Sequence, residues 1–169
     1  FWGDERCVPP DDKESNFRMA YESLLQNVPL PDANIFRIRG EDDPVTEARQ
    51  YSELVADMVP LYRGVPQFDM MLLGLGDDGH IASIFPDRPD LFTSNQLFEV
   101  AYRPDKKQKR ITATGRLINN SSKIYYIVTG KGKAAIVSDI LEGKSGSELY
   151  PASHVMPGSG HLVWMLDTG

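Results

Sequence analysis

The chain has 169 residues, of which 41% are hydrophobic and 25% charged, and this allows one buried core, so we expect a single domain over residues 1–169. Its formal net charge of −6 argues against a nucleic-acid or anionic-membrane surface, because both partners require a basic field. No apolar run approaches the roughly 20 residues that span a bilayer, and no charged-then-apolar signal segment opens the chain. The composition therefore predicts a cytoplasmic enzyme, either a monomer or a weak homo-oligomer.

The cysteine content and the first residue lead to two further expectations. The single cysteine, Cys7, excludes an internal disulfide and leaves no thiol cluster for a structural metal; it fits a small buried hydrophobe better than a nucleophile. The sequence starts at Phe1, without an initiator methionine. We therefore expect the chain to be a fragment of a longer protein.

Apolar residues at helical spacing predict two helices in the first third of the chain. The first covers residues 17–25, with Ser15 or Asn16 as its N-cap. The second begins after Asp43, whose side chain can cap it, and has Pro44 at its first helical position. Both helix starts thus carry a local signal.

Short apolar or β-prone runs separate and follow these helices. The segments expected to be extended are 34–39, 68–75, 97–102, 110–114, 123–129 and 162–166. A further helix is predicted at residues 134–141, and Gly143 ends it. Because strands and helices alternate, we expect an α/β fold with a mostly parallel sheet covered by helices on both faces.

The most unusual stretch follows the predicted strand at residues 68–75. Three glycines, two carboxylates and an imidazole occur within seven residues there, at the end of a strand where an open α/β sheet has its ligand crevice. Residues 74–79 also fit the G-x-G-x-x-G pattern of a dinucleotide site. However, Asp77 and Asp78 would face the pyrophosphate, and Pro86 breaks the helix that should bind it. We therefore expect no nucleotide cofactor.

His80 is the candidate catalytic residue of this loop. An unperturbed imidazole is the side chain best poised to gain and lose a proton near neutral pH, and Asp78 can orient the ring or stabilise its imidazolium form. The alternative is a loop histidine that caps the following turn. The setting among glycines at the end of a strand favours catalysis. His154 and His161 lack this setting, and we expect them to be structural.

Metal binding is the other function that an Asp/Asp/His group can have. The spacing of Asp77, Asp78 and His80 is too compressed for all three side chains to converge easily. No second histidine or carboxylate pairs with them at a ligand interval. The sequence therefore predicts no catalytic metal.

Three cations could bind an anionic substrate. Arg6 ends the first predicted strand, Arg110 begins another, and Lys133 stands where a loop becomes a helix whose amides add partial positive charge. In a parallel sheet these side chains could converge on one crevice, although each alone could equally be a solvated surface charge. The run at 130–133 is not a P-loop, because the upstream glycine spacing and the following Ser or Thr are absent.

Three blocks of sequence carry a resemblance to a known family. They are Phe-Trp-Gly-Asp-Glu-Arg-Cys-Val-Pro at 1–9, Ser-Asn-Phe-Arg-Met-Ala at 15–20 and Leu-Gly-Leu-Gly-Asp-Asp-Gly-His-Ile-Ala-Ser-Ile-Phe-Pro at 73–86. These blocks resemble 6-phosphogluconolactonases, the lactone hydrolases of the oxidative pentose phosphate pathway. Weaker matches continue at 110–112, 130–134, 150–153 and 164–167. The resemblance thus spans essentially the whole chain.

The resemblance implies a Rossmann-like, three-layer α/β fold and hydrolysis of a sugar-phosphate lactone without metal or other cofactor. Carried over by position, His80 is implied as the general base with Asp78 as its neighbour, and Arg6 and Lys133 as phosphate ligands. The residues implied to line the substrate pocket with them are Asp4, Asn16, Arg110, Gly76 and Gly79. Backbone N–H groups of the glycine loop are further candidates for stabilising the tetrahedral oxyanion.

One departure and two rival functions accompany this resemblance. Members of the family normally begin with a further strand, a helix and a Gly/Ser/Thr-rich phosphate loop before the block that starts here at Phe1, so we expect an N-terminally truncated domain. Amino-sugar-phosphate deaminases and isomerases share the pattern at 78–82 but usually continue Phe-Asn-Glu-Pro, where this chain has Ser-Ile-Phe-Pro at 83–86. The other rival is a non-catalytic module that binds sugar phosphates.

Overall fold

A computed structural model describes residues 1–103, 108–158 and 160–168. The helices are α1 (Asn16–Ser23), α2 (Pro44–Met58), α3 (Asp90–Thr93), α4 (Gly115–Ile118) and α5 (Ala134–Leu141), with 3₁₀ turns η1 (Leu25–Asn27), η2 (Asp32–Asn34), η3 (Lys131–Lys133), η4 (Ser147–Leu149) and η5 (Pro151–His154). The strands are β1 (Asp4–Arg6), β2 (Leu61–Tyr62), β3 (Val65–Pro66), β4 (Met71–Leu73), β5 (Phe98–Arg103), β6 (Gln108–Ala113), β7 (Lys123–Val128) and β8 (His161–Leu166).

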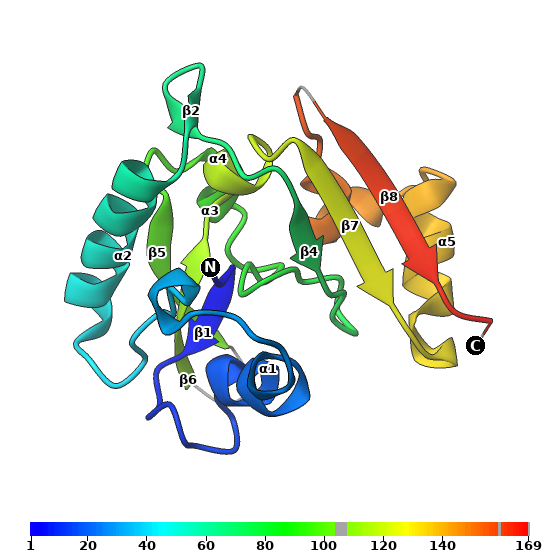
Figure 1. Ribbon diagram of the computed structural model, residues 1–169. Helices are drawn as coiled ribbons and strands as arrows, with labels where there is room; N and C mark the ends of the chain where they lie inside the picture. The colour runs from blue at the N-terminus through cyan, green and yellow to red at the C-terminus, as the bar shows by residue number, and fades with distance from the viewer. Residues whose placement is uncertain (104–107, 159, 169) are drawn as a thin grey trace.

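Two three-stranded sheets organise the molecule (Figure 1). Strands β4, β7 and β8 run parallel in the order β4-β7-β8, with α5 beside them. Strands β1, β6 and β5 are antiparallel in the order β1-β6-β5, and α2 lies along this sheet. A small hairpin of β2 and β3 projects from the end of α2.

The α/β class expected from the sequence is confirmed, but the parallel arrangement holds for only one of the two sheets. Only four residues separate Arg103 at the end of β5 from Gln108 at the start of β6. Parallel strands need a crossover of a dozen or more residues, so this short connection forces the two strands to be antiparallel. The expected convergence of Arg6 and Arg110 from parallel strands therefore has another geometric basis.

The helix starts follow their local signals. Ser15 is the N-cap of α1 and accepts a hydrogen bond from the Arg18 N–H, while Asp43 caps α2 through the Thr46 N–H. Pro44 stands at the first position of α2, as predicted. The segment at residues 34–39 is not the expected strand, because η2 ends at its first residue and its later residues join no sheet.

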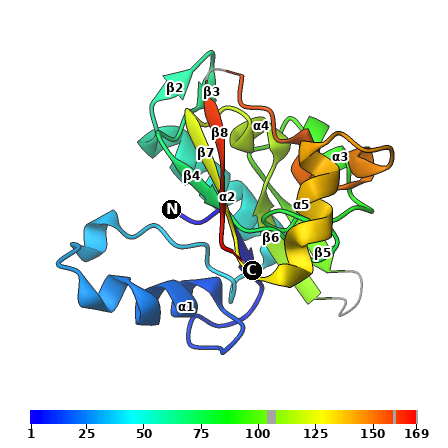
Figure 2. The same ribbon diagram turned by 90° about the vertical axis from the view of Figure 1, so that its right-hand side faces the viewer.

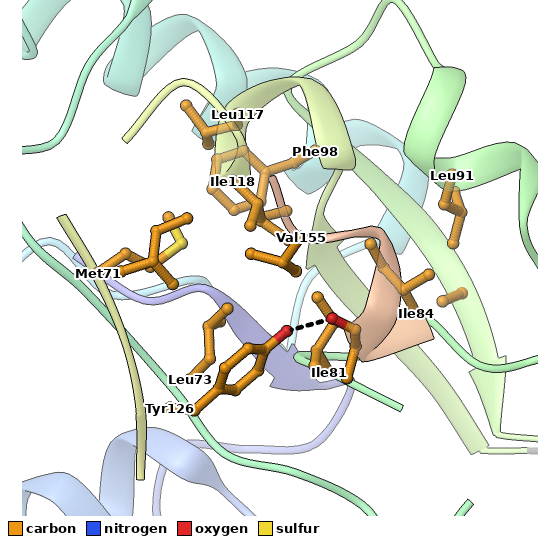
Figure 3. Packing of buried hydrophobic residues seen from close by; sticks show 14 of the residues in the cluster. Met71, Leu73, Ile81, Ile84, Leu91, Phe98, Leu117, Ile118, Tyr126 and Val155 are labelled. Carbon is orange, nitrogen blue, oxygen red and sulfur yellow. Dashed lines mark hydrogen bonds between the residues drawn. The ribbon is translucent and has the colours of Figure 1, made fainter. Parts of the chain in front are cut away.

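The core lies between the two sheets and continues under α2. Figure 3 shows Tyr126 of β7 directed toward Ile81, with Leu73 of β4, Phe98 of β5 and Ile118 of α4 in the same buried cluster. Beneath α2, the ring of Tyr51 packs edge-on against Phe98 with centroids 4.8 Å apart. One continuous apolar cluster thus joins both sheets.

The two faces of the parallel sheet are covered to different extents. Successive residues of a strand point to opposite faces, so Leu73 faces the core while Leu72 is 59% exposed. Its parallel neighbours on the same face include Val163, and further along the strands lie Ile127 and Met165, all exposed. Figure 2, which views this sheet nearly edge-on, shows α5 on one side of it and no helix over the upper part of the other. Within the described residues, α5 thus lies on one side of this sheet and α1 on the other, and the upper part of the second face is exposed.

Two further observations concern the Cys7 thiol and the length of the helices. The Cys7 thiol is half-buried, and burial is the main cause that raises its pKa to about 11. In the described part of the chain, no helix is both long and apolar enough to cross a membrane.

Candidate active site

The loop after β4 is held in one shape by its own backbone. The Gly76 N–H donates to the His80 carbonyl at 2.9 Å, and the Gly79 N–H donates to the Gly76 carbonyl at 3.1 Å. A methyl group on Gly76 would lie 2.0 Å from the Nδ1 atom of His80, and Gly79 has a φ of +79° with the Tyr150 ring against it. The two glycines therefore let the His80 ring and the Tyr150 ring approach the loop closely.

The N–H groups of Gly76 and Gly79 are not free to stabilise a substrate oxyanion, the role that the sequence suggests for the glycine loop. Both the Gly76 and the Gly79 N–H are already used inside the loop. A substrate oxygen could bind either group only by breaking a hydrogen bond that shapes the loop. Their role in this structure is to shape the loop around His80, not to present free donors.

His80 and Asp78 form a close pair. The Nδ1 atom of His80 lies 2.5 Å from Asp78 Oδ1, and the His80 main-chain N–H donates to the same oxygen at 3.1 Å. Burial alone would raise the pKa of the Asp78 carboxyl, but the hydrogen bonds from His80 outweigh it and hold that pKa below its usual range. An ionised Asp78 fixes the proton on Nδ1, which leaves Nε2 as the nitrogen able to accept one.

The antiparallel sheet supplies the opposite wall of the site. Its register places Arg6 of β1 directly opposite Arg110 of β6. Like charges in directly opposed positions destabilise a sheet. Two arginines in this arrangement therefore suggest a site for an anion rather than a contribution to folding.

Arg110 is a buried cation with an unused donor. Its residue is 4% exposed, and its Nε has no hydrogen-bond partner in the described structure. The Nη1 atom lies 3.4 Å from the Ser83 hydroxyl, which itself donates to Asp4 at 2.7 Å. Burial, and next the positive charge of Arg6, lower the pKa of the Arg110 guanidinium. An arginine remains protonated even so, and a buried charge of this kind favours an anionic ligand.

Arg6 is oriented by the start of α1. Its Nη1 donates to the carbonyl of Glu14 at 3.0 Å and to the side-chain oxygen of Asn16, while its buried Nε has no partner in the described structure. The Asn16 amide in turn donates to the carbonyl of Asp4 at 2.9 Å. Glu5, buried between them, accepts the N–H groups of Asn16 and Phe17 at 2.7 Å each. The β1 strand and α1 thus hold each other in place around Arg6.

A pocket of about 580 Å³ lies between the two walls. The predicted site residues that line it are Asp4, Arg6, Asn16, Gly76, His80 and Arg110. Asp78 adjoins it through His80, and Gly79 lies next to His80 in the loop. The pocket thus combines a histidine–carboxylate pair with one buried arginine, Arg110, and one partly buried arginine, Arg6.

Lys133 lies outside this lining. Its ammonium group pairs with Asp77 of the glycine loop, and the residue borders a second hollow of about 350 Å³ at the ends of β7 and β8. The hydrogen bond from Lys133 holds the pKa of the Asp77 carboxyl below its usual value. Lys133 therefore touches the site through the loop and not through the pocket wall.

Four residues that sequence reasoning did not single out support this site. Glu5 and Ser83 fix the cations, Phe85 packs its ring on His80 with centroids 4.7 Å apart, and Tyr150 packs on Gly79. Ser83 and Phe85 stand in the same sequence block as His80, which was an available signal; Tyr150 lies 71 residues from Gly79, and nothing local reveals the contact. In the described ranges, no group of three or more His, Cys, Asp or Glu side chains could hold a metal ion.

The chain is similar to known proteins along most of its length. A family model described as glucosamine-6-phosphate isomerases/6-phosphogluconolactonase matches residues 1–164. The chain belongs to this family. The resemblance inferred from the sequence blocks is thereby confirmed.

Relatives within the glucosamine-6-phosphate isomerase/6-phosphogluconolactonase family are similar along most of the chain. The 6-phosphogluconolactonase of Treponema pallidum is 48% identical over 141 residues, which cover 83% of this chain and 58% of that protein. The 6-phosphogluconolactonase of Haemophilus influenzae is 38% identical over 167 residues, which cover 99% of this chain and 70% of that protein. The chain thus spans just under six-tenths of one relative and seven-tenths of the other.

A solved structure confirms the fold of this family member. The 6-phosphogluconolactonase of Trypanosoma brucei superposes with a TM-score of 0.86 at 30% identity, covering 99% of this chain and 70% of that one. The Rossmann-like α/β class expected from the sequence therefore holds, with the antiparallel sheet as its correction.

Proposed function

We propose that the protein hydrolyses 6-phospho-D-glucono-1,5-lactone to 6-phosphogluconate, as a step of the oxidative pentose phosphate pathway. The observation that carries this proposal is one pocket lined by His80, which is paired with Asp78, and by the two arginines Arg6 and Arg110. Relatives named 6-phosphogluconolactonase support the substrate class. The cytoplasmic location and the monomeric or weakly oligomeric state stay predictions.

In the proposed reaction His80 acts first as a general base. With its Nδ1 proton held by Asp78, Nε2 removes a proton from water as the water oxygen attacks the C1 carbonyl carbon. The tetrahedral intermediate then expels the ring oxygen, and the imidazolium returns the proton to that oxygen as the C1–O bond breaks. The product is an open-chain acid. Acid–base help of this kind is worth about 10²–10⁴-fold.

The cations bind the phosphate in this proposal. The guanidinium groups of Arg6 and Arg110, which both line the pocket, suit an anion because charge-assisted hydrogen bonds are stronger than neutral ones, and guanidinium groups fit phosphate geometry. Asp4 and Asn16 hold these side chains in position and can accept hydrogen bonds from sugar hydroxyl groups. Lys133 would join the phosphate after exchanging its present partner, Asp77.

The rival deaminase or isomerase activity fits the pocket less well. Those enzymes usually have a glutamate at the position of Phe85 in the sequence block. Here the Phe85 ring is 1% exposed and packs against His80, with the Arg110 guanidinium 5.7 Å from its centroid. The carboxylate that ring-opening and proton-transfer chemistry would use is therefore replaced by an apolar ring.

The test is lactone hydrolysis with freshly generated substrate and the spontaneous rate subtracted. His80→Ala should lower kcat about 10²–10⁴-fold, whereas His154→Ala, whose ring packs on Phe92 away from the pocket, should leave it unchanged. Equal rates for the wild type and His80→Ala would refute the base assignment. If the wild type shows no turnover but 6-phosphogluconate raises its melting temperature, the protein is a sugar-phosphate-binding module instead.

A further inference from the structure

The glycine loop is attached to the body of the protein through a buried tyrosine. Tyr126 of β7 is fully buried, and its hydroxyl donates to the carbonyl of Ala152 at 2.8 Å. Figure 3 shows this side chain reaching from β7 into the core, with the hydrogen bond drawn at its tip. Burial strongly raises the pKa of the Tyr126 hydroxyl, so it stays protonated and remains a donor.

Ala152 passes this constraint to the loop. Its N–H donates to the carbonyl of Gly79 at 3.0 Å. Ala152 is 1% exposed, so water cannot take the place of either hydrogen-bond partner, the Gly79 carbonyl or the Tyr126 hydroxyl, without a large cost in free energy. The neighbouring Tyr150 ring lies so close to Gly79 that an added methyl group there would come within 2.7 Å of it. The segment from Tyr150 to Ala152 thus holds Gly79 in place through one hydrogen bond and one ring contact.

This constraint on Gly79 also positions the His80 imidazole, because Gly79 directly precedes His80. The loop is closed by the Gly79 N–H on Gly76 and by the Gly76 N–H on the His80 carbonyl, so it moves as one unit. A shift of the Gly79 carbonyl therefore displaces His80 and changes its alignment with the arginines on the other wall. Phenylalanine would fill the same space as Tyr126, and a buried tyrosine hydroxyl usually has a specific partner.

We propose that Tyr126 is a positioning residue that fixes His80 in the pocket through the Ala152 main chain and Gly79. The proposal rests on the lactonase function proposed above, because it assigns a reason for the placement of His80. It adds a residue 46 positions away in sequence that touches neither the substrate pocket nor the reacting atoms.

The experiment compares Tyr126→Phe with a matched hydroxyl deletion. Thr114→Val removes a hydroxyl that is equally buried and donates to the carbonyl of Gln96 at 2.7 Å, but in a part of the core that does not support the loop. Tyr126→Phe should lower kcat for the lactone about tenfold, since an error near 1 Å in position can cost up to about 10²-fold. The KM and the affinity for 6-phosphogluconate should stay within twofold, because the two arginines are untouched. Thr114→Val should destabilise the fold without changing kcat.

A second measurement makes the result independent of turnover. Amide hydrogen exchange at Ala152 and His80 should quicken in Tyr126→Phe relative to both wild type and Thr114→Val. Tyr150→Leu, which removes the ring contact and leaves Tyr126 intact, should move kcat and exchange in the same direction by less.

The outcomes separate the two proposals. Equal kcat and equal exchange for Tyr126→Phe and Thr114→Val would overturn the positioning role and reduce Tyr126 to a core hydrogen bond. If the wild-type protein shows no turnover above the spontaneous rate, the lactonase function fails, and the exchange data alone still decide whether Tyr126 holds the loop.

Discussion

The two walls of the pocket are built in opposite ways. The wall from the antiparallel sheet is a partly buried network in which Asp4, Arg6 and Arg110 are held by side chains from several elements. The wall from the parallel sheet is a short loop whose glycines fold tightly around His80 and Asp78. In the proposed reaction, the first wall presents fixed charges and the second presents the His80 imidazole, which gains and loses a proton. Changes in the first should therefore alter KM, and changes in the second should alter kcat.

The largest effect that would test this division comes from Gly76→Ala. The added methyl group would meet the His80 ring at 2.0 Å and push it away from Asp78, so kcat should fall about 10²-fold while phosphogluconate still binds. Gly158→Ala, where nothing lies within 4 Å of the added group, is the control and should behave as wild type. A large rise in KM with unchanged kcat would contradict the assignment of chemistry to this wall. Steady-state kinetics and a binding titration make the measurement.

A somewhat smaller effect, on KM, is expected from Arg110→Met. Hydrogen bonds to charged groups contribute about 1.5–3 kcal/mol, so losing this guanidinium should raise KM roughly 10- to 100-fold. The kcat should change much less, because His80 and Asp78 are untouched. Arg88→Met, which removes an arginine paired with Asp90 outside the pocket, serves as the control. If Arg110→Met reduced kcat as strongly as it raised KM, the assignment of substrate binding to one wall and of chemistry to the other would be wrong.

The smallest effect is confined to stability and depends on pH. Hydrogen bonds from the Thr46 main-chain N–H and hydroxyl hold the pKa of the Asp43 carboxyl, the N-cap of α2, below its usual value. A lowered folded-state pKa gives stability that is present above the unfolded value, near 3.9, and is lost as pH falls through the folded one. Asp43→Ala should therefore lower the melting temperature at pH 7, and the difference from wild type should shrink below about pH 4.

The control for this last prediction is catalytic. The kcat and KM of Asp43→Ala at pH 7 should match the wild type well below its melting temperature, because α2 supports the antiparallel sheet from the side away from the pocket lining. A difference in melting temperature that stayed constant down to pH 2 would show that Asp43 stabilises α2 by a means other than its charge.

The sequence was informative wherever the cause is local. Ser15, Asp43 and Pro44 start their helices as predicted, because an N-cap or a proline acts on the next few residues. The loop at His80 was also recognisable, since its glycines and carboxylates are contiguous. The contact between His80 and Asp78 joins residues two positions apart and depends on no distant segment.

Sequence reasoning failed wherever the cause is a contact between distant segments. The pairing of Arg6 with Arg110 depends on an antiparallel register between strands about a hundred residues apart, and alternation of helices and strands suggested the opposite direction. Tyr126 reads as one apolar residue of a buried strand until Ala152 is found at its hydroxyl. The pairing of Lys133 with Asp77 likewise depends on how two loops meet in space, while the role of Lys133 at the phosphate stays a prediction.

The protonated thiol at the end of β1 has a consequence for redox behaviour. Cys7 directly follows Arg6, so oxidation or alkylation of that sulfur would disturb the anion-binding wall. With a pKa of about 11, however, the thiol forms little thiolate at neutral pH, and the thiolate is the form that reacts. Oxidants and disulfides in the surrounding medium should therefore react only slowly with Cys7.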